Sequence, residues 1–257
     1  MLILLSPAKS LDLDTPPPLP ARGGLEFPDD TAELAALLRQ KSAPELMALM
    51  GVSEKIARLN CDRFAAFPVA FGGDLAARPA LFTFSGEVYR SLDAGSLDAA
   101  SVEWAERHLR ILSGLYGLLR PLSPLFPYRL EMGTPLANGR GNSLYDFWGE
   151  RIAARIALDT QPQEIVINLA SNEYFRAVRP EALARRVVTP LFHELQGEKR
   201  RIVGVLAKKA RGRMARYAIL RRIDDPEALK AFDLDGYRFD PAHSDADTWS
   251  FARRERS

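Results

Sequence analysis

The pattern of apolar and polar positions along the chain predicts an α/β protein. Short, largely apolar runs at Leu2–Leu5 and Glu164–Leu169 indicate buried strands. Longer stretches at Val102–Leu119 and Ala207–Arg222 have the residue pattern of helices. We therefore expect class α/β (α+β), with a mixed sheet, surrounding helices and a single domain over residues 1–257.

A helical hairpin is predicted within Leu46–Asn60. Apolar residues at helical spacing lead up to Gly51, which is free to adopt the positive φ that commonly ends a helix. Ser53 then offers an N-cap for a second helix. Two interpretations fit this pattern, namely a pair of helices that only packs on the core and a turn that binds a ligand.

Residues 42–62 resemble the helix-hairpin-helix motif of proteins that bind DNA without regard to sequence. Four positions match its pattern of apolar residue, glycine and alanine, whereas Ser53 stands where the motif has a second glycine. A helix N-terminus offers free N–H groups to a phosphate, and Lys55 adds a cation beside it. The turn residues expected to contact DNA are Gly51, Val52, Ser53 and Lys55.

Charge is distributed unevenly, although the net charge of the chain is only +2. Residues 199–222 contain ten Lys or Arg and no acid, whereas residues 223–248 contain eight acids and two basic residues. Because like charges repel, the basic stretch favours an anionic partner such as a phosphate backbone. Alternatively, the acidic stretch folds back and neutralises it. The residues expected to line a DNA groove are Lys208, Lys209, Arg211, Arg213 and Arg216.

Composition narrows the class of protein. A single cysteine, Cys61, excludes an intramolecular disulfide and fits a reducing compartment. One cysteine and three scattered histidines leave no metal-ligand spacing. No apolar run approaches the roughly 18 residues of a membrane span, and the N-terminal residues lack the features of a signal peptide. We therefore expect a cytoplasmic monomer with no metal, no cofactor and no membrane contact.

Polar residues follow two of the predicted strands, where open α/β sheets bind their ligands. Lys9 comes after the first strand, and Asn172 and Glu173 come after the Glu164–Leu169 strand. A lysine amine beside a carboxylate is typical of base-removing glycosylases and lyases. The simpler interpretation is that Lys9 is a solvated loop residue and that Ser171 or Asn172 caps a helix.

A third segment adds candidates for the same cleft. Pro127–Gly133 is predicted to be an extended segment. Because successive side chains of such a segment point to opposite sides, Arg129 and Glu131 lie on the same side. The catalytic candidates are Lys9, Asn172 and Glu173, and the further cleft candidates are Arg129, Glu131 and Tyr174.

Seven segments, taken in order, resemble the YaaA family of bacterial peroxide-stress proteins. They are LILLSPAKSLD at Leu2–Asp12, FSGEVYRSL at Phe84–Leu92, HLRILSGLYGLLRPL at His108–Leu122, PYRLEMG at Pro127–Gly133, YDFWG at Tyr145–Gly149, INLASNEYF at Ile167–Phe175 and AKKARGRMARY at Ala207–Tyr217. Long motifs in matching order are far more specific than any short pattern. The resemblance implies a cytoplasmic α/β protein of unusual fold, with a basic cleft, a helix-hairpin-helix element and binding to duplex DNA.

The resemblance also implies protection of DNA when peroxide meets intracellular iron, and hence a link to iron homeostasis. We expect a double-stranded DNA-binding protein of the peroxide response that selects DNA structure rather than sequence, including bent, damaged or junction forms. The hairpin turn and the basic stretch are expected to converge on one groove. The alternative is a nucleic-acid-processing enzyme, a glycosylase or lyase that uses Lys9 with Asn172 and Glu173.

Overall fold

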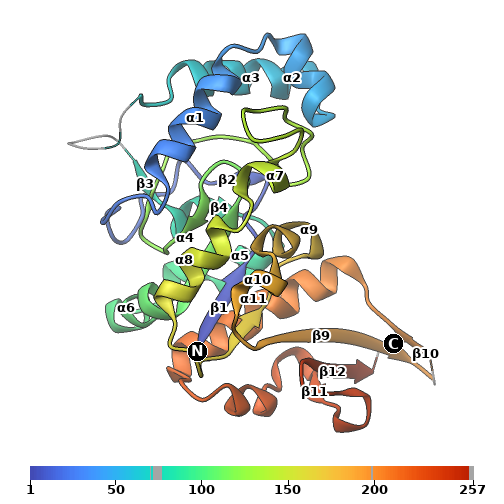
Figure 1. Cartoon of the computed structure of the whole chain (residues 1–257). Coiled ribbons are helices and arrows are strands. Elements are labelled where there is room, and N and C mark those ends of the chain that lie inside the picture. Colours follow the sequence, from blue (N-terminus) through green and yellow to red (C-terminus); the bar gives the residue numbers. More distant parts are fainter. Residues whose placement is uncertain (70, 72–76, 198, 255–257) are drawn as a thin grey trace.

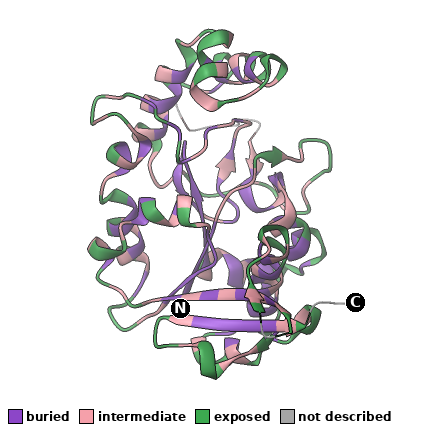
Figure 2. Cartoon of the chain, turned by 90° about the vertical axis from the view of Figure 1, so that its right-hand side faces the viewer, coloured by how far each residue is buried: buried purple, intermediate pink, exposed green. Residues whose placement is uncertain are grey.

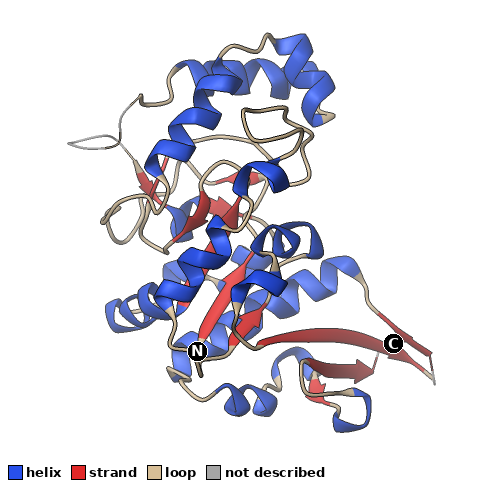
Figure 3. Cartoon of the chain, in the orientation of Figure 1, coloured by secondary structure: helices blue, strands red, loops and turns tan. Residues whose placement is uncertain are grey.

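The computed structural model is built from strands and helices that alternate irregularly along the chain (Figure 3), and it describes residues 1–69, 71, 77–197 and 199–254. The strands are β1 Leu2–Leu5, β2 Ser10–Leu11, β3 Arg78–Pro79, β4 Phe84–Ser85, β5 Leu109–Ser113, β6 Gly117–Leu119, β7 Pro124–Leu125, β8 Val166–Asn168, β9 Val187–Gln196, β10 Lys199–Arg201, β11 Arg238–Phe239 and β12 Thr248–Arg254. Together with the helices, these strands confirm the predicted α/β class.

The helices surround the sheet and form a lobe at one end of the molecule (Figure 1). The α-helices are α1 Pro28–Arg39, α2 Ala43–Met50, α3 Glu54–Ala65, α4 Ala80–Thr83, α5 Glu87–Leu92, α6 Ala99–His108, α7 Leu144–Trp148, α8 Arg151–Asp159, α9 Asn172–Phe175, α10 Pro180–Leu183 and α11 Gly204–Arg221. The 3₁₀ helices are η1 Ala94–Ser96, η2 Arg176–Val178, η3 Pro226–Ala231, η4 Leu234–Gly236 and η5 Pro241–His243. Across the described residues, no helix combines the length and apolar character needed to cross a membrane.

The main sheet is mixed, as predicted, and has the strand order β11-β12-β9-β8-β1-β5-β6, with β10 paired to β9. Strand β1 pairs in parallel with both β5 and β8, and β8 pairs in parallel with β9. Every residue of β1 is buried because helices cover both faces of the sheet, which explains its unbroken apolar sequence. The carboxyl ends of these parallel strands share one edge of the sheet.

Apolar side chains from Met1 to Phe251 pack into one buried cluster. Figure 2 shows the buried residues concentrated in the central strands, whereas the helices at the top carry exposed faces. The predicted single domain over residues 1–257 includes positions 70, 72–76, 198 and 255–257, which lie outside the described residues. The domain boundary therefore stays a prediction.

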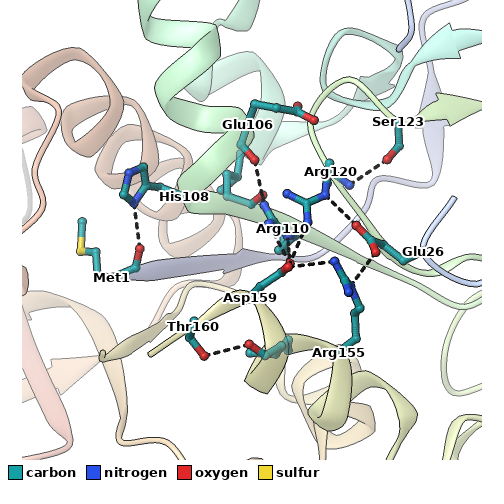
Figure 4. A network of polar contacts seen from close by, with 12 residues as sticks. Met1, Glu26, Glu106, His108, Arg110, Arg120, Ser123, Arg155, Asp159 and Thr160 are labelled. Carbon is teal, nitrogen blue, oxygen red and sulfur yellow. Dashed lines mark hydrogen bonds and ion pairs between the residues drawn. The ribbon is translucent and has the colours of Figure 1, made fainter. Parts of the chain in front are cut away.

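A network of ion pairs is centred on Asp159 (Figure 4). Arg110 is 2% exposed and contacts Asp159 at 2.7 Å. Arg120 contacts Asp159 at 2.9 Å and Glu26 at 2.6 Å, and Arg155 contacts Asp159 at 2.9 Å. The network ties β5 and α8 to the long irregular connection that carries Glu26.

The predicted helix over Val102–Leu119 is wrong beyond His108, where α6 ends. The next eleven residues are buried on every side and form the β5–β6 hairpin, with Gly117 at φ +68°. Because every residue of this run is buried, its pairing with β1, and not its own periodicity, decides between helix and strand.

The predicted helical pair is present as α2 and α3. Gly51 ends α2 with φ 60° and ψ 41°, the left-handed conformation expected of it. Ser53 occupies the N-cap position of α3 but makes no side-chain capping hydrogen bond. The two helices and the glycine turn are therefore confirmed, whereas the use of this hairpin as a DNA-binding helix-hairpin-helix stays a prediction.

Candidate functional site

The principal cavity of interest lies at the carboxyl ends of β1 and β8. We call it the strand-end pocket; it measures about 420 Å³. It is lined by residues 6–10, 85–89 and 128–131, by four residues within 169–174, and by Lys208 and Arg211 of α11. Segments that are far apart in sequence thus meet at the sheet edge where parallel strands present ligand sites.

Hydrogen bonds between the strand ends fix the inner wall of the pocket. The hydroxyl of Ser6 accepts a hydrogen bond from the backbone N–H of Ser171 at 2.8 Å. The phenol of Tyr89 donates to the carbonyl of Ser6 at 2.8 Å. The chain after β1 is therefore tied both to the chain after β8 and to α5.

Helix α11 reaches the pocket because Gly212 lets it approach α5 closely. A Cβ atom on Gly212 would lie 2.1 Å from the carbonyl oxygen of Val88 and 3.0 Å from the Cβ of Ser91. Glycine inside a helix lowers helix stability by roughly 1 kcal/mol relative to alanine, so its presence here points to packing. The contact places Arg211, which directly precedes Gly212, and Lys208, one turn earlier on α11, at the rim of the pocket.

The acidic side chains of the pocket are already engaged. Glu131 contacts the Lys9 amine at 2.6 Å and the Arg129 guanidinium at 3.0 Å. Glu173 accepts a hydrogen bond from the backbone N–H of Gly133 at 3.0 Å. These carboxylates consequently do not neutralise the cations of α11.

Two cations of α11 have no such partner. Within the described part of the chain, neither Lys208 nor Arg211 makes an ion pair or a hydrogen bond. Lys208 is exposed, whereas Arg211 is half-buried, and its burial lowers the pKa of the guanidinium from the ordinary value. The Nε of Arg129 is also buried without a hydrogen-bond partner. The pocket therefore offers unpaired donors and positive charge.

The floor of the pocket is aromatic. Tyr128 and Tyr174 are 5% and 8% exposed, and Tyr128 shares a hydrogen bond of 2.7 Å with Ser113. Burial raises the pKa of both phenols above its ordinary value, so they remain neutral at physiological pH. A neutral aromatic surface beneath a cationic rim suits a planar ligand that carries negative charge.

A second depression lies on the other side of the α5–α11 contact, and we call it the α11 hollow. It measures about 540 Å³ and includes Lys209 and Arg213. Here the cations have counter-charges, because Lys209 lies 3.7 Å from Glu87 and Arg213 lies 3.5 Å from Asp235. Glu87 also lines the strand-end pocket, so the two depressions adjoin.

The structure brings most of the predicted cleft residues together in the strand-end pocket. They are Lys9, Arg129, Glu131, Glu173, Tyr174, Lys208 and Arg211. Asn172 does not line it and begins α9, with Ser171 at the N-cap position but without a side-chain capping hydrogen bond. Arg216 lies in neither depression and donates to the carbonyls of Leu92 and Asp93, both at 2.9 Å.

The expected convergence of the hairpin with the basic stretch on one groove does not occur in either depression. Gly51, Val52 and Ser53 connect α2 to α3, and Lys55 lies in the first turn of α3. Helices α2 and α3 lie at the top of Figure 1, whereas α11 lies in the lower half. None of the four lines the strand-end pocket or the α11 hollow. Charge counts along a sequence carry no information on which surface each stretch occupies.

Sequence reasoning missed the residues that shape the site. Tyr128 is buried and lines the pocket beside Arg129, but nothing in the sequence marks it as part of a ligand site. Gly212 was overlooked, although a glycine inside a helical pattern is a signal of close packing. The described residues contain no group of three His, Cys, Asp or Glu side chains that is suited to a metal ion.

The sequence matches a family of known proteins along most of its length. Residues 1–243 match the family model described as "Peroxide stress protein YaaA". A "UPF0246 protein" of Paracidovorax citrulli is 50% identical over 260 residues, and the match covers 99% of each chain. A protein of the same description from Aliivibrio fischeri is 48% identical over 259 residues, and one from Hahella chejuensis is 47% identical over 255 residues. The Aliivibrio match covers both chains completely, and the Hahella match covers 98% of this chain and 99% of the relative.

Proposed function

Since the chain belongs to the family of the peroxide stress protein YaaA, we propose that it binds double-stranded DNA during the response to peroxide. The interaction selects the structure of the duplex rather than its sequence and limits the damage that iron causes. The observation that carries this proposal is the pair of unpaired cations, Lys208 and Arg211, at the rim of the strand-end pocket.

The competing explanation, internal neutralisation, accounts for only part of the basic stretch. The acid-rich stretch supplies Asp240 to Arg200 at 2.6 Å and Asp235 to Arg213 at 3.5 Å. It supplies nothing to Lys208 or Arg211 among the described residues. Contacts between cations and backbone phosphates release counterions and need no base recognition, so they favour binding that is independent of sequence.

The α2–α3 hairpin supports a separate contact with the same duplex. Lys55 and Gly51 are exposed, and Ser53 leaves the first N–H groups of α3 without a side-chain cap. These groups and the Lys55 charge suit a phosphate. Because the hairpin lies at the top of the molecule and α11 lies below its middle (Figure 1), a duplex that touches both has to run along the molecule or bend.

A binding panel of nicked, bent, abasic and junction duplexes tests the proposal, with each DNA also examined for cleavage products. We expect affinity to fall about tenfold or more when salt rises a few-fold, because several phosphates are contacted. We also expect the distorted duplexes to bind more tightly than the regular one. Binding that is indifferent to salt contradicts the proposal.

The protection from iron has a physical basis in the same contacts. Ferrous iron is a cation and associates with the phosphates that Lys208 and Arg211 are proposed to occupy. Protein bound to those phosphates displaces iron from the DNA surface, where peroxide would otherwise generate radicals. A plasmid-nicking assay with ferrous iron and peroxide measures this effect. We expect fewer nicks with wild-type protein than with the Lys208→Met/Arg211→Met variant, and equal nicking speaks against the mechanism.

A second candidate function is removal of a damaged base. It is favoured by the presence of Lys9 and Glu173 in one pocket, although the carboxylate in contact with Lys9 is that of Glu131. Borohydride trapping on DNA with an abasic site tests a lysine-dependent lyase. An adduct that disappears in Lys9→Ala supports this chemistry, and the lack of any adduct rejects a lysine-based lyase.

A further inference from the structure

The net charge of the side chains that line the strand-end pocket indicates the charge of the ligand that it binds. Four basic and three acidic side chains line it, which leaves one positive charge: Lys9, Arg129, Lys208 and Arg211 against Glu87, Glu131 and Glu173. Glu131 contacts both Lys9 and Arg129, whereas Lys208 and Arg211 contact no carboxylate among the described residues, so the unpaired cations lie at the α11 side of the pocket. A ligand group with one negative charge therefore balances the pocket, and a phosphodiester carries one.

The donors at this side match a phosphate in geometry as well as in charge. A guanidinium presents N–H groups in a planar fork that binds two oxygens of a phosphate, and a lysine amine adds a point charge. Arg211 is partly removed from water and lacks a counter-charge among the described residues, which is unfavourable unless a ligand supplies one.

The floor of the pocket matches a base. Tyr128 and Tyr174 are buried and neutral, and Leu130 and Leu169 add apolar surface beside them. Nucleic-acid bases stack on tyrosine in a manner that tolerates any sequence. A cavity of about 420 Å³ lies in the range of small-ligand sites, roughly 300–1,000 Å³, and a base pair within a duplex cannot enter it.

We propose that the strand-end pocket binds a single nucleoside phosphate unit, with its phosphate at Arg211 and Lys208 and its base over Tyr128 and Tyr174. The unit is either a nucleotide extruded from DNA or a free mononucleotide. In the first case the inference rests on the proposed function, and the nucleotide has to leave the base stack before it enters. A free mononucleotide carries close to two negative charges, so the charge balance favours the extruded nucleotide.

Extrusion makes the pocket a sensor of DNA structure. A paired base has to lose its partner and its stacking before it reaches Tyr128 and Tyr174, whereas an unpaired base has less to lose. The pocket thereby discriminates duplexes by the ease with which one nucleotide leaves the helix, with no contact that reads sequence.

The experiment compares two fluorescent duplexes that differ only in one unpaired nucleotide, at equal salt. We expect wild-type protein to bind the duplex with the unpaired nucleotide about tenfold more tightly. Arg211→Met removes this preference, so that the ratio of the two affinities approaches one. Arg213→Met, in the α11 hollow, weakens binding to both duplexes but keeps the ratio.

A third titration uses deoxyadenosine 5′-monophosphate alone and measures heat. Binding as tight as that of the unpaired duplex, lost in Arg211→Met, supports the pocket with a free mononucleotide as ligand. Equal affinity for the two duplexes, together with no heat from the mononucleotide, overturns the inference and leaves DNA binding intact. No binding to either duplex overturns the proposed function instead.

The test does not depend on one variant. Arg211 makes no hydrogen bond or ion pair among the described residues, so Arg211→Met is expected to fold, which circular dichroism checks. Lys208→Met changes an exposed side chain at the same rim and gives the same comparison in milder form. If both folded variants keep the wild-type preference, the assignment of the phosphate to α11 is wrong.

Discussion

Two clusters of basic side chains in this protein have opposite relations to their counter-charges. In the Asp159 network, the buried Arg110 and the half-buried Arg120 both contact Asp159, at 2.7 and 2.9 Å (Figure 4). At the strand-end pocket, Arg211 and Lys208 contact no carboxylate among the described residues. Buried charges that only stabilise a fold are paired within it, since an unpaired one is costly. The paired arginines around Asp159 therefore stabilise the fold, whereas the unpaired Lys208 and Arg211 are available to bind a ligand.

The same comparison explains why the net charge of the chain does not indicate whether it has a site for an anionic ligand. A net charge of +2 does not distinguish the Asp159 network, whose arginines contact carboxylates, from the α11 rim, where Lys208 and Arg211 contact none among the described residues. The α11 hollow is intermediate, because Lys209 and Arg213 have carboxylates at 3.7 and 3.5 Å, which is long for an ion pair. A phosphate binds a Lys or Arg side chain most easily where the protein itself places no carboxylate, or only a distant one, beside that side chain.

Removal of the core carboxylate should have the largest effect on stability. Asp159→Asn leaves Arg110 buried beside a neutral amide, and we expect a loss of about 3–5 kcal/mol in the free energy of unfolding. Urea denaturation measures it. Asp233→Asn is the control, because its ion pair with Arg238 is exposed and should contribute less than about 1 kcal/mol. Similar losses in both variants would refute the contrast between core and surface.

Displacement of α11 should have the next largest effect. Gly212→Ala puts a Cβ 2.1 Å from the carbonyl oxygen of Val88, and we expect a loss of about 1–3 kcal/mol together with weaker DNA binding. Gly204→Ala lies in the same helix with no atom within 4 Å of the added Cβ, so it should be neutral or slightly stabilising. Thermal unfolding and DNA titration of the two variants distinguish them, and a neutral Gly212→Ala contradicts the packing argument.

The smallest effect concerns pH. Burial raises the pKa of Glu106, although the N–H of Leu122 and nearby arginines act in the opposite direction. The folded state then holds this proton more tightly than the unfolded state, so stability is lost as pH rises through the raised pKa. The unfolding temperature of Glu106→Gln relative to wild type should therefore increase between about pH 4 and about pH 7. A relative decrease over that range would show that Glu106 is stabilised in its charged form.

Local signals in the sequence were enough for several elements. The apolar run Leu2–Leu5, the glycine turn at Gly51 and the helix of the basic stretch are all present, because each depends on neighbouring residues alone. The strand β5 was not predictable in this way, since all of its residues are buried and its partner β1 lies more than a hundred residues away in sequence. Long-range pairing overrides local pattern there.

The candidate site was predictable in its members but not in its contacts. Lys9, Glu131 and Glu173 were expected in one cleft, and all three line the strand-end pocket. The contact of Lys9 with Glu131 was not foreseen, because it depends on how the loop after β7 folds over the strand ends. The separation of the α2–α3 hairpin from α11 is likewise a property of the tertiary fold.

The central claim, that Lys208 and Arg211 hold phosphate, is tested most directly by the salt dependence of binding to a duplex oligonucleotide. We predict that Lys208→Met/Arg211→Met lowers affinity and reduces the slope of log affinity against log salt by about two, since each phosphate contact contributes roughly 0.9. Arg107→Met removes an exposed charge on α6 and should leave the slope unchanged. If the double variant shows the same affinity and the same slope as the wild-type protein, the claim is contradicted.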